Sequence, residues 1–218
     1  MKRKDLLDLI EEGESLHVEF KRKFSSPEKI AREVVAFANT SGGYIIFGID
    51  DDKSVVGVES EKSESEMMRD VANNYCEPPV NLNISYVDLN GKEIVIAEIP
   101  ESDTKPHRLQ DYNDKINLND AVVTIRVKDK SVLASKEMIK IMQARSNDLS
   151  LKNYSFGPNE KAAFDYLRRN ETISVKELSE LVNISSRRAS RTLINLVRAN
   201  VLAVHVKDNG EEFFTSVS

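Results

Sequence analysis

The segment 14–51 constrains the fold of this chain more than any other, because its pattern predicts three successive elements. Residues 15–21 alternate apolar and polar side chains, which is typical of a half-buried strand. Ser26, followed by proline, is a suitable helix N-cap, and the two glycines at 42–43 can end a helix. Residues 44–49 are apolar throughout, as expected of a central strand. The predicted order is therefore strand, helix, strand.

Periodicity and turn signals predict further helices and strands before residue 145. Asn90-Gly91 is a strong tight-turn signal and joins two of the strands in a hairpin. Residues 100–121 are rich in Asp, Asn, Pro and Lys, and a loop of that length in a compact domain is often functional. The helices are expected over 5–12, 67–75 and 135–144, and the strands over 80–88, 92–99 and 122–127.

The pattern changes after residues 147–157, which carry few secondary-structure signals and are expected to be a linker. Beyond them the sequence predicts three helices and a two-stranded hairpin, the order of a winged helix-turn-helix domain. We therefore expect an α+β protein with a first domain over 1–146 and a winged helix over 158–218. The helices are expected over 159–169, 174–182 and about 186–200, and the strands over 204–207 and 211–215.

The third of these helices has one apolar and one basic face. At about 100° per residue, its aliphatic residues share one side, and a recognition helix needs the opposite side to present guanidinium groups to DNA. Two other readings stay open. Arginines on an amphipathic helix are often only its solvated face. Winged helices also serve as dimerisation or protein-docking modules, and the acidic hairpin tip at 208–212 is unlike the basic wings of many DNA-binding domains. The candidate DNA contacts are Arg187, Arg191 and Arg198, with Arg188 toward one flank.

Charge and cysteine content narrow the class of protein. The formal net charge is −5, with nine Lys/Arg against eight Asp/Glu over 155–218 (+1) and 22 against 28 over the rest (−6). A basic binding surface must therefore be local. A single cysteine, Cys76, permits no internal disulfide and no Cys-based zinc site, so a reducing, cytoplasmic location is expected. No apolar run is long enough to span a bilayer.

Acidic side chains gather at the ends of the two strands of the first segment. Glu14 precedes the first strand, Glu19 lies within it near its end, and Asp50 and Asp51 follow the second. Carboxylate oxygens suit hard cations such as Mg²⁺ or Mn²⁺. The alternative interpretation is that Glu19 forms an ion pair with Lys21, which shares its strand face, and that Asp50 and Asp51 only form a turn.

Three further residues could contribute chemistry. His17 lies near the acidic group as a candidate acid, base or ligand, although such a histidine is more often an ordinary strand residue. Lys105 and His107 lie in the long loop and are candidate phosphate contacts.

Several motifs are separated along the chain: Glu14 with Glu19-Phe20-Lys21, residues 36–43, residues 47–50 and Val56-Gly57. In this order they resemble the Schlafen AlbA-like domain family, over roughly residues 5–145. The resemblance implies a mixed-sheet domain, and an attached winged helix is similar to prokaryotic members of the family. The family's tyrosine-arginine-glycine signature is reduced here to Ile125-Arg126-Val127-Lys128.

In Schlafen-type RNases of this family, two glutamates and an aspartate bind a divalent metal and cut structured RNA such as tRNA. The resemblance carries these roles to Glu14, Glu19 and Asp50 or Asp51, with Lys21 as a phosphate contact. Such nucleases generally pair two domains, so a homodimer is expected of a chain with one. The sequence has no Gly-(four residues)-Gly-Lys-Ser/Thr loop, which leaves an ATPase activity without support.

Three hypotheses follow. The leading one is a nucleic-acid-binding protein, specifically a DNA-binding transcriptional regulator. The alternative is a Schlafen-like endoribonuclease that cuts tRNA or other structured RNA through Glu14, Glu19 and Asp50 with Mg²⁺ or Mn²⁺. The third is a regulator that senses a partner and touches no nucleic acid.

Overall fold

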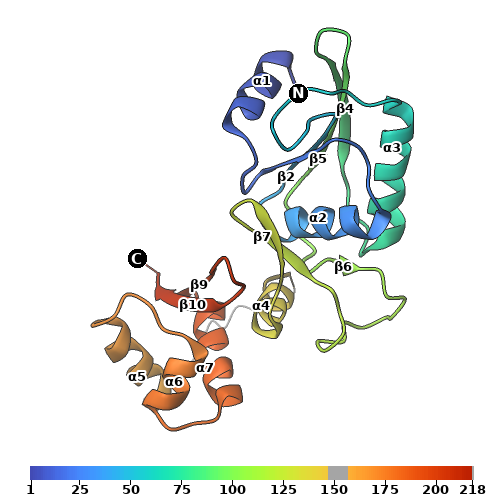
Figure 1. The fold of residues 1–218 in the computed structure, drawn as a ribbon. Coiled ribbons are helices and arrows are strands. Elements are labelled where there is room, and N and C mark those ends of the chain that lie inside the picture. Colours follow the sequence, from blue (N-terminus) through green and yellow to red (C-terminus); the bar gives the residue numbers. More distant parts are fainter. Residues whose placement is uncertain (147–156, 218) are drawn as a thin grey trace. The chain divides into compact units, whose positions relative to one another are not determined.

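The computed structural model describes residues 1–146 and 157–217. Its contacts divide the chain into two compact units, Met1–Leu133 and Ala134–Ser218 (Figure 1). The expected linker at 147–157 falls outside the described residues, apart from Gly157. Helix α4 (Lys136–Ser146), which we expected at the end of the first domain, is grouped with the C-terminal unit.

A four-stranded mixed sheet forms the core of the N-terminal unit. The strand order is β1-β2-β5-β4, with β1 parallel to β2 and the other neighbours antiparallel. The parallel pair is the predicted strand–helix–strand, and β2 is an interior strand as expected. The α+β class is thereby confirmed. The strands are β1 (Val18–Lys21), β2 (Gly43–Phe47), β4 (Asn83–Asp88) and β5 (Glu93–Ile99).

A helix covers each face of this sheet, and successive residues of a strand point to opposite faces. Ile45 and Phe47 pack with α2 (Pro27–Asn39) on one face, and Ile46 packs with α1 (Arg3–Glu12) on the other. Helix α2 begins at the predicted N-cap, where Ser26 Oγ accepts a hydrogen bond from the N–H of Lys29 (3.4 Å).

The helix expected over 67–75 differs from the observed one. Helix α3 (Glu61–Asp70) begins six residues earlier, with Ser60 as N-cap, and η1 (Val71–Tyr75) continues it as a π-helix. The first turns of α3 are polar, so apolar periodicity identified only its second half.

The long loop after β5 is fastened to the end of α2 through Asn39. The side-chain amide of Asn39 donates to the carbonyls of His107 (2.8 Å) and Thr124 (3.0 Å), and the N–H of His107 donates back (2.7 Å). This places two short antiparallel pairs beside α2. They are β3 (Cys76–Glu77) with β6 (Arg108–Leu109), and β7 (Thr124–Val127) with β8 (Lys130–Leu133).

The C-terminal unit contains the three predicted helices and hairpin, together with α4. The hairpin closes the core where Phe214 bridges to Ile173, and Ile141 of α4 enters the same core. The elements are α5 (Pro158–Leu167), α6 (Val175–Leu181), α7 (Ser186–Arg198), β9 (Leu202–Val206) and β10 (Glu212–Ser216).

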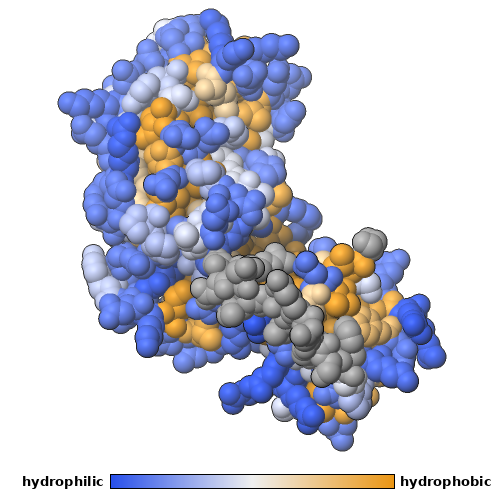
Figure 2. Space-filling model, turned by 180° about the vertical axis from the view of Figure 1, so that it is seen from behind, coloured by the Kyte–Doolittle hydropathy of each residue, from blue (hydrophilic) through white to orange (hydrophobic). Residues whose placement is uncertain are grey.

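Polar residues dominate the face drawn in Figure 2, with hydrophobic residues between them on the N-terminal unit. Within residues 1–146 and 157–217, each helix is too short or too polar to cross a membrane.

Gly43 allows β1 and α2 to approach β2 closely. A Cβ at this position would lie 2.5 Å from the carbonyl oxygen of His17 and 2.5 Å from the ring of Phe37.

We therefore expect Gly43→Ala to lower the free energy of unfolding by about 2–3 kcal/mol, since overpacking forces the backbone to move. Urea denaturation would measure this loss. The control is Gly91→Ala, where nothing lies within 4 Å but φ is +81°, and we expect a loss of roughly 1 kcal/mol. Equal losses would contradict the close-approach explanation.

Candidate nucleic-acid interface and buried charge network

The acidic residues expected to share a metal have separate protein partners. Glu14 Oε1 accepts a hydrogen bond from the N–H of Phe20 (3.0 Å). Asp50 Oδ2 pairs with Arg22 Nη1 at 2.6 Å, and Asp51 is exposed, with its N–H donating to Asp50 Oδ1 (3.1 Å).

Glu19 is the carboxylate most fully engaged by cations. Its Oε1 pairs with Lys21, and its Oε2 lies 2.8 Å from Arg126 Nη1. In the described part of the chain, no group of three or more His, Cys, Asp or Glu side chains could hold a metal ion. The residues Glu14, Glu19 and Asp50 therefore do not fit the Mg²⁺ or Mn²⁺ site that the family resemblance implied.

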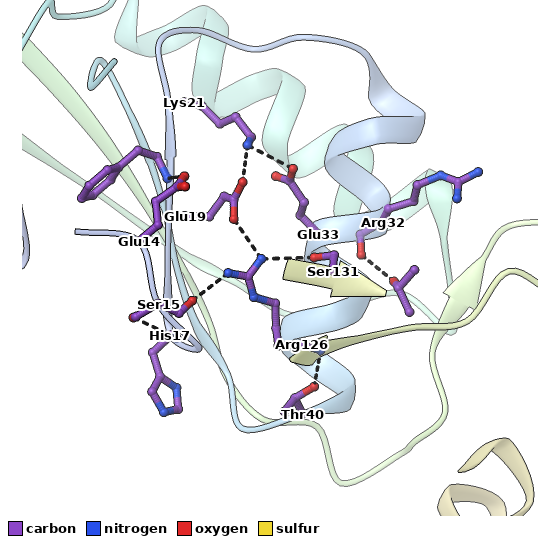
Figure 3. Close-up of polar contacts among 12 residues, drawn as sticks. Glu14, Ser15, His17, Glu19, Lys21, Arg32, Glu33, Thr40, Arg126 and Ser131 are labelled. Carbon is purple, nitrogen blue, oxygen red and sulfur yellow. Dashed lines mark hydrogen bonds and ion pairs between the residues drawn. The ribbon is translucent and has the colours of Figure 1, made fainter. Parts of the chain in front are cut away.

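Arg126 connects Glu19 to the backbone around it (Figure 3). Its side chain is 1% exposed, its Nη2 donates to the carbonyl of Ser15 (2.7 Å), and its guanidinium lies 4.6 Å from the ring centroid of Phe37. A buried guanidinium is tolerated only with a carboxylate and further hydrogen bonds around it. Glu19 therefore holds Arg126 in place, and with it β7.

Lys21 extends this arrangement to α2. Its ammonium bridges Glu19 and Glu33, with Oε1 of Glu33 at 3.1 Å (Figure 3). We define the buried charge network as Glu19, Lys21, Glu33 and Arg126, in which two carboxylates balance two cations. Lys21 thus lies between carboxylates, which agrees with the ion-pair interpretation of the sequence.

Glu33 is compensated only in part, because it shares the ammonium of Lys21 with Glu19. Burial raises the pKa of Glu33 to about 7, although the charge of Lys21 acts in the opposite direction. Burial lowers the pKa of Lys21, but Glu33 and Glu19 together outweigh it and raise that pKa overall. Burial also raises the pKa of Glu14, with the charge of Glu19 adding to it.

The sequence contained signals for the two members of the network that we did not single out. Arg126 stands between Ile125 and Val127 in a strand, and Glu33 follows Ile30 by three residues on the buried side of α2. A charged residue at an inward position predicts a buried partner of opposite sign. Neither signal identifies which partner that is.

The candidate contacts in the long loop are used within the fold. His107 is 2% exposed, its Nδ1 lies 2.7 Å from the carbonyl of Pro78, its Nε2 lies 2.6 Å from Ser102 Oγ, and burial lowers its pKa. Lys105 donates to the carbonyl of Thr40 (2.7 Å) and pairs with Glu101. The ring of His17 contacts the carbonyl of Gly42 (3.1 Å).

The basic face of α7 is accessible at its N-terminal end. Arg187, Arg188 and Arg191 are exposed, whereas Arg198 is half-buried with its Nε inaccessible. Two hollows of about 570 and 470 Å³ lie against this face, and both are lined by Arg187, Arg191 and Asn195. We call Arg187, Arg188 and Arg191 the arginine row. Within the described residues, none of the three forms a hydrogen bond or ion pair through its side chain.

The start of α7 lacks the usual acidic residues. Ser185 Oγ accepts from the N–H of Arg188 (3.3 Å), and the first turn holds two arginines and no acid. Helix α6 shows the usual pattern, since Glu177, at the corresponding position, accepts from the N–H of its N-cap Ser174 (2.7 Å). Cations near a helix N-terminus oppose the helix dipole by about 0.3–1 kcal/mol each. Arg187 and Arg188 are therefore placed where they lower helix stability.

Comparison with known proteins identifies the family of this chain. The sequence model described as Schlafen, AlbA_2 matches residues 14–135, more than half of the chain. The chain therefore belongs to the Schlafen AlbA_2 family, as its motifs indicated, and this family is associated with nucleic-acid-related function.

Three individual relatives share between 16% and 28% sequence identity with this chain. An uncharacterized ATP-binding protein of Ureaplasma parvum serovar 3 is 28% identical over 176 residues, 78% of this chain and 42% of the relative. The chain thus spans less than half the length of that relative. The N-terminal domain of a RecG-related protein from Nitrosomonas europaea is 25% identical over 51% of this chain and 81% of its own, with a TM-score of 0.40. The DIP2311 protein from Corynebacterium diphtheriae is 16% identical over 92% of this chain and 34% of its own, with a TM-score of 0.45.

The raised pKa of Glu33 predicts how stability depends on pH. The folded protein binds the Glu33 proton more tightly than the unfolded chain does, so stability falls as pH rises from about 4.5 to about 7. Glu33→Gln removes this loss. Relative to the wild type, we expect the variant to gain up to about 3 kcal/mol in free energy of unfolding between pH 4.5 and pH 8. Urea denaturation at several pH values measures the gain.

The control is Glu66→Gln, whose side chain is 65% exposed on α3 and which should follow the wild type. The explanation fails if Glu33→Gln and the wild type show parallel pH profiles.

Proposed function

We propose that this protein binds DNA through α7 and acts as a transcriptional regulator, with its C-terminal unit as a winged helix-turn-helix domain. The order of three helices followed by a two-stranded hairpin supports this assignment. In that order α7, the last helix before the strands, takes the place of the recognition helix. Membership of the Schlafen AlbA_2 family supports nucleic acid as the class of ligand.

The arginine row is the observation that carries the proposal. Arg191 stands four residues after Arg187 and three after Arg188, spacings at which like charges repel by about 0.2–0.5 kcal/mol per pair. Arg187 and Arg188 lie in the first turn of the helix and oppose its dipole. Within the described residues no carboxylate pairs with them. A bound phosphate would remove both penalties, because it is attracted by guanidinium groups and by a helix N-terminus. The residues are therefore suited to an external polyanion.

The rest of α7 holds this row outward. Its apolar side is buried in the core with Leu193 and Leu196 each 0% exposed. The hairpin contributes little charge, since Lys207 pairs with Glu211 (3.6 Å). We therefore assign the main DNA contact to α7. A homodimer, which would double this surface, stays a prediction.

An endoribonuclease receives less support from the geometry. Both carboxylate oxygens of Glu19 contact cationic side chains, and Asp50 forms an ion pair with Arg22. We therefore propose that the N-terminal domain contributes dimerisation, ligand sensing or a second nucleic-acid contact.

Replacement of Arg191 tests the proposal directly. If Arg191 neutralises a phosphate, Arg191→Ala should lower the slope of log affinity against log salt by about one unit and weaken binding roughly five- to ten-fold at about 0.1 M salt. Fluorescence anisotropy with a labelled duplex measures both. Arg168→Ala is the control, because that side chain is 80% exposed and pairs with Asp165 on α5. Identical salt slopes for wild type and Arg191→Ala would contradict DNA binding by this helix.

Arg188→Glu separates stability from binding. The new carboxylate would reproduce at α7 the capping arrangement that Glu177 makes at α6, so we expect the variant to be more stable by about 1 kcal/mol. Its affinity for DNA should nevertheless fall by roughly ten-fold or more at about 0.1 M salt. Thermal denaturation and anisotropy measure the two effects.

Lys161→Glu makes the same change in net charge at an exposed position on α5 and should leave DNA affinity close to that of wild type. Equal losses of affinity in the two variants would show that net charge alone, and not Arg188, governs binding.

A further inference from the structure

Helix α4 belongs to the structural surroundings of α7. Its Ile141 is 1% exposed in the core of the C-terminal unit. Glu137 Oε1, one turn earlier, accepts a hydrogen bond from Oγ of the buried Ser190 on α7 (2.8 Å). These two contacts fix α4 along one side of α7. The sequence separates the two helices by about forty residues, and only the fold brings them together.

Lys140 lies on this helix between the two anchoring residues and faces the hollow of about 470 Å³ beside α7. The side chain is exposed and forms no hydrogen bond or ion pair within the described residues. The only acid near it on α4, Glu137, is directed to Ser190. The hollow is lined by Lys140, Arg187, Ser190, Arg191, Ile194, Asn195 and Arg198, four of them cationic and none carboxylic.

Three exposed cations around one hollow, Lys140, Arg187 and Arg191, favour an anion there. None of the three forms an ion pair within the described residues and no lining residue carries a carboxylate, so an anion in the hollow would be attracted by all of them. The geometry of a duplex suggests which anion. A helix with its side chains is about 10–12 Å across and fills a major groove of about 12 Å, so elements beside a recognition helix meet the phosphates of the groove walls. Phosphate contacts of this kind position a protein without reading sequence.

We infer that the DNA-binding surface extends onto α4, where Lys140 contacts a backbone phosphate that occupies the hollow shared with Arg187, Arg191 and Arg198. This inference rests on the proposed function of α7. It assigns to Lys140 a positioning contact, independent of base sequence, and makes α4 part of the DNA-binding module.

The test compares Lys140→Ala, Lys140→Arg and Lys161→Ala with wild type and Arg191→Ala on two unrelated duplexes of about 30 base pairs, roughly three helical turns. Lys140→Ala should reduce affinity roughly five- to ten-fold at about 0.1 M salt and lower the salt slope by about one unit. The reduction should be the same on both duplexes, because a phosphate contact carries no sequence information. Lys140→Arg and Lys161→Ala should keep the affinity and salt slope of wild type. Circular dichroism verifies that each variant is folded, as expected for exposed side chains.

The outcomes distinguish this inference from the proposal on which it rests. Loss of affinity in both Arg191→Ala and Lys140→Ala, with Lys161→Ala unchanged, supports it. Loss in Arg191→Ala alone overturns the role of Lys140 and leaves DNA binding by α7 standing. An unchanged salt slope in Arg191→Ala, or no binding by wild type, overturns the proposed function and the inference with it.

Discussion

The ion pair between Glu19 and Arg126 is the interaction on which the N-terminal unit most depends. It joins β1 to β7 across more than one hundred residues of sequence, at a distance of 2.8 Å and almost out of contact with water. Removing Glu19 would leave the guanidinium of Arg126 buried without its ion-pair partner, at a cost of about 3–5 kcal/mol. Lys21 and Glu33 extend the same balance to α2. Glu19, one of the acidic residues that suggested a metal site, thus helps to hold three elements together.

In the C-terminal unit, by contrast, the charges of interest are exposed and lack partners among the residues that the structure describes. Its arginine row is exposed and forms no ion pair within the described residues, and two of its three members stand in the first turn of a helix, where cations are unfavourable. Local rules of stability are usually broken where function requires it. One chain therefore contains a buried set of charges that is balanced internally and an exposed set that is balanced only by an external ligand, and this contrast separates structural from functional residues.

Sequence patterns predicted the order of elements well and their tertiary partners poorly. Ser26, the double glycine at 42–43 and the Asn90-Gly91 turn are local signals, and each appears where expected. The start of α3 was missed because its first turns are polar. Arg126 was quoted only as part of a degenerate motif, because nothing in a linear pattern says that its partner lies at position 19.

The sequence by itself determined the class of fold, the family and the amphipathic division of α7, because these depend on periodicity, caps and motifs within short windows. Tertiary structure alone decided the use of each charge. It paired Glu19 with Arg126 and so removed it from a metal site, buried His107, and brought Lys140 of α4 beside α7. The physical reason is that the energy of a charge depends on its burial and on its nearest opposite charge, and both are set by residues distant in sequence.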